Sequence, residues 1–104
     1  MKSITPEELK QRLESFTPLL LDVREPWEFE LCRIAGSTHL PMGQIPQRHA
    51  ELDRGAEIVV ICHHGMRSAQ VTQYLDSLGF QGVYNLTGGI DAWSRQVDPE
   101  VPVY

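Results

Sequence analysis

The residues of this chain that are most able to do covalent chemistry lie in one short segment. A cysteine, Cys62, ends the apolar and largely β-branched run 57–62, and Gly65, Arg67 and Ser68 follow within six residues. The run is too short for a helix and predicts a buried strand, and Gly65 predicts a tight loop before a helix. In a parallel α/β sheet, ligands bind at the carboxyl ends of the strands, which is where we expect Cys62.

The loop after Cys62 has the features of an anion-binding site around a nucleophilic sulfur. A loop that leads into a helix directs several backbone N–H groups at one point, with the positive end of the helix dipole behind them. Such a nest favours the thiolate form of a cysteine, and Arg67 adds a fixed positive charge at the same rim. These features predict that Cys62 is a nucleophile toward a substrate that carries an oxyanion. The alternative is a buried thiol that only packs.

Two adjacent histidines, His63 and His64, raise the question of a metal site with Cys62 as a third ligand. Adjacent residues at a strand end are expected to diverge, and no spaced pair of cysteines or histidines completes such a site. We therefore expect no metal, with the histidine rings on the outer surface of the loop and their N–H groups facing the sulfur. A further hypothesis is that a protonated imidazole helps to hold Cys62 as a thiolate.

Charged residues and a second thiol lie outside this loop. Asp22, Arg24 and Glu25 are predicted to form a structural charge network beneath it, with Arg24 able to reach the mouth of the site. For Arg67, an ion pair with Asp22 is the alternative to a role in binding, and both can hold at once. Cys32 has no comparable anion nest around it and is predicted to pack. In a reducing compartment, two cysteines in such different contexts do not indicate a disulfide framework.

The surrounding patterns alternate between helix and strand, which predicts an α/β fold with a small, mainly parallel sheet flanked by helices on both faces. A capping box at Thr5 and Glu8 starts the first helix, and Gly79 ends a later one. We predict that Trp27, Phe29 and Trp93 lie in the core. In chain order, the patterns predict helix to about residue 15, strand 19–23, a short helix from 25, strand 37–40, a partly helical segment 44–52, strand 57–62, helix 68–78, strand 83–86 and a short helix after 89.

Length and composition exclude several classes of protein. The chain has 104 residues and a mass of 11.8 kDa, which predicts a single domain over residues 1–104. A formal net charge of -5 repels phosphate backbones and anionic lipids, so we expect neither nucleic acid nor a membrane surface as a partner. The apolar runs are too short to span a bilayer, and the first residues lack the pattern of a signal peptide. We therefore expect a cytoplasmic protein.

In order along the chain, four segments resemble the motifs of the rhodanese family of sulfurtransferases. These segments are Leu21-Asp22-Val23-Arg24 with Trp27-Glu28-Phe29, residues 34–41, the Cys-x-x-Gly-x-Arg-Ser loop 62–68, and residues 86–93 with their Gly-Gly and Ala-Trp pairs. One departure is that Cys32 and Arg33 stand where a Gly-His pair is common. The resemblance covers almost the whole chain, which is similar to the single-domain members because tandem members need twice this length.

The resemblance implies a two-step reaction that needs no metal and no organic cofactor. The Cys62 thiolate attacks the outer sulfur of a small-molecule donor, thiosulfate or a persulfide, and thiosulfate then releases sulfite. The Cys62 persulfide passes its sulfur to cyanide or to a thiol acceptor, which can belong to a protein. Arg67 attracts the sulfonate of the donor, and Ser68 helps to fix the start of the helix. The implied loop that binds the substrate and the persulfide consists of His63, His64, Gly65, Met66, Arg67 and Ser68.

Two other functions remain open. Four residues separate Cys62 from Arg67. Related cysteine-dependent phosphatases and arsenate reductases have a loop one residue longer, which holds a tetrahedral oxyanion, so the shorter loop favours sulfur. Met66 puts an apolar wall beside the site, which also suits sulfur better than phosphate. The other alternative is a non-catalytic sulfur-relay or binding module, which differs from the enzyme in whether a small donor supports turnover.

Overall fold

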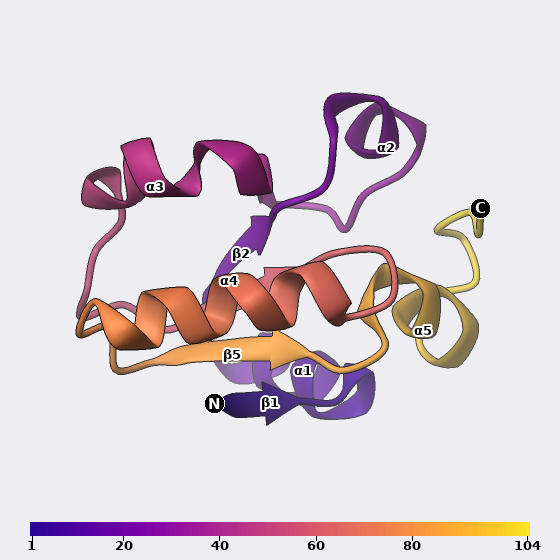
Figure 1. The fold of residues 1–104 in the computed structure, drawn as a ribbon. Helices are drawn as coiled ribbons and strands as arrows, with labels where there is room; N and C mark the ends of the chain where they lie inside the picture. Colours follow the sequence, from indigo (N-terminus) through magenta and orange to yellow (C-terminus); the bar gives the residue numbers. More distant parts are fainter.

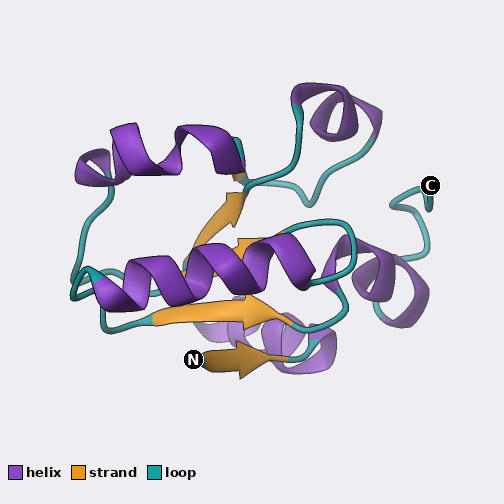
Figure 2. Cartoon of the chain, in the orientation of Figure 1, coloured by secondary structure: helices purple, strands orange, loops and turns teal.

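The computed structural model describes all residues from Met1 to Tyr104. The elements are β1 (Lys2–Ile4), α1 (Pro6–Ser15), β2 (Leu19–Asp22), α2 (Pro26–Leu31), β3 (Thr38–His39), η1 (Met42–Gln44), α3 (Ile45–Arg48), η2 (His49–Glu51), β4 (Ile58–Ile61), α4 (Met66–Ser77), β5 (Val83–Leu86) and α5 (Gly89–Gln96). All strand pairs are parallel, and the order in the sheet is β1-β5-β4-β2-β3 (Figures 1 and 2). The predicted α/β class is confirmed. No helix is long and apolar enough to cross a bilayer.

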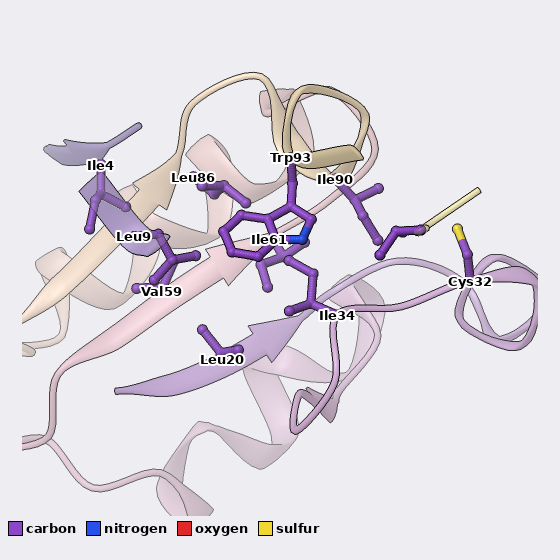
Figure 3. Close-up of a cluster of buried hydrophobic side chains, with 11 residues drawn as sticks. Ile4, Leu9, Leu20, Cys32, Ile34, Val59, Ile61, Leu86, Ile90 and Trp93 are labelled. Carbon is purple, nitrogen blue, oxygen red and sulfur yellow. The ribbon is translucent and has the colours of Figure 1, made fainter. Parts of the chain in front are cut away.

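The sheet, with β4 as its central strand, separates two clusters of buried hydrophobic side chains. Helices α1 and α5 cover one face of the sheet, and α3 and α4 cover the other (Figure 1). Alternate residues of a strand point to opposite faces. Accordingly, Val59 and Ile61 pack in the cluster with α1 and α5, which Figure 3 shows, whereas Val60 and Cys62 pack in the cluster with α3 and α4. The register of β4 therefore places Cys62 on the face of the sheet that α4 covers.

Glycine and capping residues set the helix boundaries. The predicted capping box of α1 is present, since the Glu8 N–H donates to Thr5 Oγ1 at 3.1 Å and the Thr5 N–H donates to Glu8 Oε1 at 2.8 Å. Helix α4 begins at Met66, two residues earlier than predicted. The reason is that Gly65, with φ +100°, forms the N-cap itself. Gly79, with φ +96°, follows α4 as predicted.

Only one of the three aromatic residues predicted for the core is buried there. Trp93 is 6% exposed and packs among the side chains of Figure 3. Trp27 is 62% exposed, so the prediction that it lies in the core is wrong. Phe29 is half-buried and stacks on His39, with the ring centroids 4.5 Å apart. The short helix α2 buries a single residue, Glu28, which leaves the aromatic side chains beside it outside the core.

Two further parts of the fold differ from the sequence prediction. Strand β1 was not predicted, because it has three residues and only Ile4 is buried, which leaves no periodic pattern to detect. The segment predicted as partly helical over residues 44–52 divides into η1, α3 and η2. Only Ile45 is buried in these three turns, and a single apolar anchor does not stabilise a longer helix.

Candidate active site

The candidate site opens where β4 ends and the chain turns into α4. Cys62 is 1% exposed and follows the last residue of β4. It lines a pocket of about 210 Å³ together with His63, His64, Met66 and Arg67. Met66 is 77% exposed and forms an apolar part of the rim. The structure thus brings these five residues, each predicted to belong to the site, around one opening.

The sulfur of Cys62 has two polar neighbours at the start of α4. The N–H of Gly65 donates to Sγ over 3.0 Å, and the hydroxyl oxygen of Ser68 lies 3.2 Å from Sγ. Because Gly65 has φ +100°, a conformation that other residues rarely adopt, the glycine is what allows this turn. The predicted anion nest therefore has at least one backbone donor already directed at the sulfur.

Asn85 of β5 determines how the Ser68 hydroxyl is oriented. Asn85 Nδ2 donates to the Gly65 carbonyl over 3.2 Å, so its Oδ1 faces the Ser68 hydroxyl. An amide oxygen carries no hydrogen, and Ser68 is therefore the donor in that pair. While that bond is made, Ser68 presents only lone pairs to Cys62, so a hydrogen bond across the 3.2 Å contact requires the protonated thiol as its donor. Sequence reasoning missed Asn85; its one signal was a polar residue inside the otherwise apolar strand 83–86.

The first turn of α5 holds the loop from behind. The Ile90 N–H donates to the Cys62 carbonyl over 2.8 Å, and the Asp91 N–H donates to the His63 carbonyl over 3.1 Å. In a trans peptide the C=O and N–H point in opposite directions. Anchoring these two carbonyls therefore turns the N–H groups of His63 and His64 away from α5. The free N–H groups at the start of one helix thus fix the loop that leads into another.

Arg67 forms its ion pair with Glu28 of α2, so the proposed pairing with Asp22 is wrong. Its guanidinium makes two parallel contacts, Nη1 to Oε1 at 2.7 Å and Nη2 to Oε2 at 2.9 Å. The Glu28 side chain is 4% exposed and also accepts from the Tyr104 hydroxyl at 2.8 Å. Arg67 itself remains 35% exposed beside the pocket. The two roles considered for Arg67, structural pairing and contact with a substrate, are thus compatible.

The Asp22–Arg24 pair is present, but Arg24 is fully buried and does not reach the mouth of the site. Its Nη2 lies 2.7 Å from Asp22 Oδ2 and donates to the Cys32 carbonyl over 2.6 Å, and its Nη1 donates to the Tyr104 hydroxyl over 2.9 Å. Burial works to lower the pKa of Arg24, but the bonds to Asp22 and Tyr104 outweigh it and raise the pKa. Glu25, predicted to belong to this network, is exposed and forms no ion pair.

Tyr104 joins the charged residues to the loop, a role that sequence reasoning missed. Its hydroxyl lies between Arg24 and Glu28, and burial is the main reason that its pKa is raised to about 12. Its ring stacks on His63, with centroids 3.9 Å apart and an interplanar angle of 5°. Its carbonyl contacts His63 Nε2 at 2.9 Å. The tail that carries Tyr104 was predicted only to be extended, since Pro99 and Pro102 interrupt any pattern.

The side chains of His63 and His64 do not diverge, so the expectation that weighed against a metal site is wrong on this point. The ring centroids of His63 and His64 lie 3.9 Å apart, because stacking on Tyr104 keeps His63 beside its neighbour. His64 is exposed, as expected, whereas His63 is only partly so. Burial and the proximity of His64 lower the pKa of His63. This lowered pKa disfavours a protonated His63 imidazole as a partner for the Cys62 thiolate.

The Glu28–Arg67 pair leads to a prediction about stability in acid. The hydrogen bonds from Arg67 lower the pKa of Glu28 from 4.5 to about 2, against the effect of burial. Because the folded-state pKa is the lower one, ionised Glu28 stabilises the fold above pH 4.5 and loses this effect as the pH falls toward about 2. We expect Glu28→Gln to lower the free energy of unfolding at pH 7 by about 3 kcal/mol, and the difference to shrink in this window.

Urea unfolding at several pH values between 7 and about 2.5 measures this dependence. The matched control is Glu14→Gln, because Glu14 is exposed on α1 and makes no side-chain contact with the site. A Glu28→Gln difference from the unmodified chain that stays constant across the acid range would contradict the account.

Comparison with known proteins agrees with this geometry. A model of the rhodanese-like domain matches residues 5–96, and the chain therefore belongs to the rhodanese-like domain family. The sulfurtransferase of Allochromatium vinosum is 39% identical over 102 residues, which cover 97% of this chain and 95% of that protein. A rhodanese-related protein from Thermoplasma volcanium has a similar structure, with a TM-score of 0.87, 32% identity and full coverage of both chains.

Other relatives are longer. The rhodanese-like/PpiC domain-containing protein 12 of Arabidopsis thaliana chloroplasts is 38% identical over 112 residues, and the match spans 38% of its length. The predicted family and fold are confirmed by these findings, and the relatives named sulfurtransferase support sulfur transfer as the general activity.

Proposed function

We propose that this protein transfers a sulfane sulfur from thiosulfate or a persulfide to a thiol or to cyanide through a persulfide on Cys62. The observation that carries the proposal is the 3.0 Å hydrogen bond from the Gly65 N–H to Cys62 Sγ, at the carboxyl end of a buried strand. A backbone donor fixed on the sulfur before reaction stabilises negative charge there without reorganisation. The relative named sulfurtransferase supports sulfur transfer as the general activity.

In the first step, the Cys62 thiolate attacks the outer sulfur of thiosulfate. A new S–S bond forms to Cys62, the S–S bond within thiosulfate breaks, and its electron pair leaves with sulfite. In the second step, a thiolate or cyanide attacks the terminal sulfur of the persulfide, and the electron pair of the broken S–S bond returns to Cys62. The products are a new persulfide or thiocyanate, and no oxidant or reductant is consumed.

The neighbouring residues support this cycle electrostatically. The N–H of Gly65, the N-cap of α4, donates to the sulfur, which therefore lies near the positive end of the helix dipole. The guanidinium of Arg67, held by Glu28 yet 35% exposed, attracts the sulfonate of the donor. When Cys62 is a thiolate it has no proton to donate to Ser68, so the serine proton turns from Asn85 toward Sγ. This rotation gives the charged sulfur a second donor.

A paired assay tests the proposal against its enzymatic alternative. Thiocyanate formation from thiosulfate and cyanide is measured beside hydrolysis of an aryl phosphate, with the same preparation. We expect turnover in the first assay and none in the second, because the loop between Cys62 and Arg67 is four residues long. Phosphate hydrolysis without thiocyanate would overturn the proposal. If neither reaction occurs, thiosulfate is excluded as the donor, and the same assay with a low-molecular-weight persulfide then decides between the persulfide as donor and a binding or relay role.

Replacement of Ser68 by alanine should slow sulfur uptake without preventing it. The variant keeps Cys62 and the Gly65 donor but loses the hydroxyl that turns toward the charged sulfur. We expect the single-turnover rate with thiosulfate to fall about tenfold or more. Ser77→Ala is the control, because Ser77 is exposed at the far end of the same helix. A Ser68→Ala rate equal to that of the unmodified chain would show that the hydroxyl does not take part.

A further inference from the structure

We propose that His63, His64 and Asp91 bind a divalent transition-metal ion, such as Zn²⁺, at the rim of the Cys62 pocket. One ligand atom from each of the three residues lies within 4.8 Å of the other two. Two imidazoles and a carboxylate are the ligands that Zn²⁺ takes in sites with three protein ligands and one open position. This inference concerns ion binding alone and holds whether or not Cys62 transfers sulfur.

One ring nitrogen of His63 makes the hydrogen bond that metal-bound histidines usually make with the nitrogen that does not bind the metal. Its Nε2 lies 2.9 Å from the Tyr104 carbonyl, which can only accept a hydrogen bond. Nε2 therefore carries the proton, and Nδ1 keeps a free lone pair for a metal. Metal-bound histidines usually donate their other N–H to a carbonyl or carboxylate, which fixes the tautomer and the ring. The 3.9 Å stack on Tyr104 immobilises the ring further.

A backbone hydrogen bond joins the two segments that carry the ligands, the loop before α4 and the first turn of α5. Asp91 belongs to the first turn of α5, and its N–H donates to the His63 carbonyl over 3.1 Å. This hydrogen bond keeps the Cα atoms of His63 and Asp91 close together, so their side chains start from neighbouring positions. His64 is exposed, which allows its ring to turn. With Zn–N bonds of about 2.0–2.1 Å in a tetrahedral site, ligand atoms lie about 3.4 Å apart. Atoms as far as 4.8 Å apart must therefore approach by up to about 1.5 Å, through rotation of the His64 and Asp91 side chains.

Arg95 competes with a metal for Asp91. Its Nε lies 3.0 Å from Asp91 Oδ2, and the Arg95 side chain is 63% exposed. An exposed pair at this i,i+4 spacing on a helix is weak and readily broken. Removal of Arg95 should therefore strengthen metal binding, whereas removal of the Asp91 charge should weaken it. Both changes break the same ion pair, so their opposite effects separate metal ligation from stabilisation of the helix.

Calorimetric titration with Zn²⁺ tests the site, first with the unmodified chain and then in a Cys62→Ser background that removes the thiolate as a competing ligand. We expect one ion per chain in both. In the serine background, affinity should fall at least about tenfold in His64→Ala and in Asp91→Asn, and rise in Arg95→Ala. His49→Gln, which changes a histidine on η2 outside the cluster, should leave it unchanged. Circular dichroism shows whether each variant folds.

Three results would overturn the inference. One is the absence of Zn²⁺ binding to the unmodified chain, and another is undiminished affinity in both His64→Ala and Asp91→Asn. The third is binding that disappears with Cys62→Ser alone, since the thiolate would then be the ligand. Because the titration contains no sulfur donor, its outcome is independent of the proposed sulfur transfer. If Asp91→Asn proves unstable, the response of Arg95→Ala still tests the assignment.

Discussion

Cys62→Ser is expected to lose thiosulfate-dependent thiocyanate formation by at least about a thousandfold. A serine oxygen cannot form the S–S bond on which both steps depend, and its hydroxyl is not ionised near neutral pH. The smaller hydroxyl can keep hydrogen bonds to Gly65 and Ser68, so the fold should survive. Steady-state kinetics with thiosulfate and cyanide measure the loss, and urea unfolding shows that the variant is folded.

The matched control is Cys32→Ser, because Cys32 is the only other cysteine of the chain. It packs in the cluster of Figure 3, and its sulfur lies 3.9 Å from Arg24 Nη1. We expect activity within a few-fold of the unmodified chain, and a loss of stability of about 1–3 kcal/mol from burying a hydroxyl. Loss of turnover in Cys32→Ser with retention in Cys62→Ser would exchange the roles of the two cysteines and refute the proposed nucleophile.

Gly89→Ala should be among the most damaging single-methyl substitutions in this chain. A Cβ at Gly89 would lie 2.4 Å from the His63 carbonyl oxygen and 2.5 Å from that of Cys62, and φ is +64°. The first turn of α5 would have to withdraw from the loop, which breaks the bonds from Ile90 and Asp91. We expect the free energy of unfolding to fall by about 3 kcal/mol or more. Activity should also fall, because the loop carbonyls lose their donors.

Two other glycines separate the causes of this effect. Gly36 has φ +82° but an added Cβ meets nothing within 4 Å, so Gly36→Ala should cost about 1–2 kcal/mol from backbone conformation alone. Gly43→Ala has neither problem and should change stability by no more than about 0.5 kcal/mol. Urea unfolding of all three variants gives the comparison. If Gly89→Ala costs no more than Gly36→Ala, the close contact between α5 and the loop is not what stabilises the site.

Those parts of the fold with a local pattern could be predicted from the sequence. Strand β4 and the position of Cys62 directly after it could be predicted because a short β-branched run before Gly65 has few other interpretations. The start of α4 was placed two residues late, since nothing local shows that Gly65 itself is the N-cap. Strand β1 exists only through its pairing with β5, with Lys2 opposite Tyr84. A three-residue edge strand has no pattern of its own.

The residues that support the candidate site could not be predicted in the same way, because they come from distant elements. Glu28 reaches Arg67 across 39 positions of the sequence, and Tyr104 reaches Glu28 across 76. The side chain of Glu28 is the one that α2 buries, which no helical periodicity indicates in six residues. Asn85 was the one partner with a usable signal, since a polar residue inside a buried strand requires hydrogen-bond partners.

The proposed persulfide on Cys62 is tested by the intact mass of the chain after incubation with thiosulfate and removal of the excess donor. We expect a gain equal to one sulfur atom, located on the peptide that contains Cys62, absent in Cys62→Ser and discharged by cyanide with formation of thiocyanate. An unchanged mass after incubation with thiosulfate and with a low-molecular-weight persulfide would contradict it. Hydrolysis of an aryl phosphate by that same preparation would then assign the loop to phosphoryl chemistry.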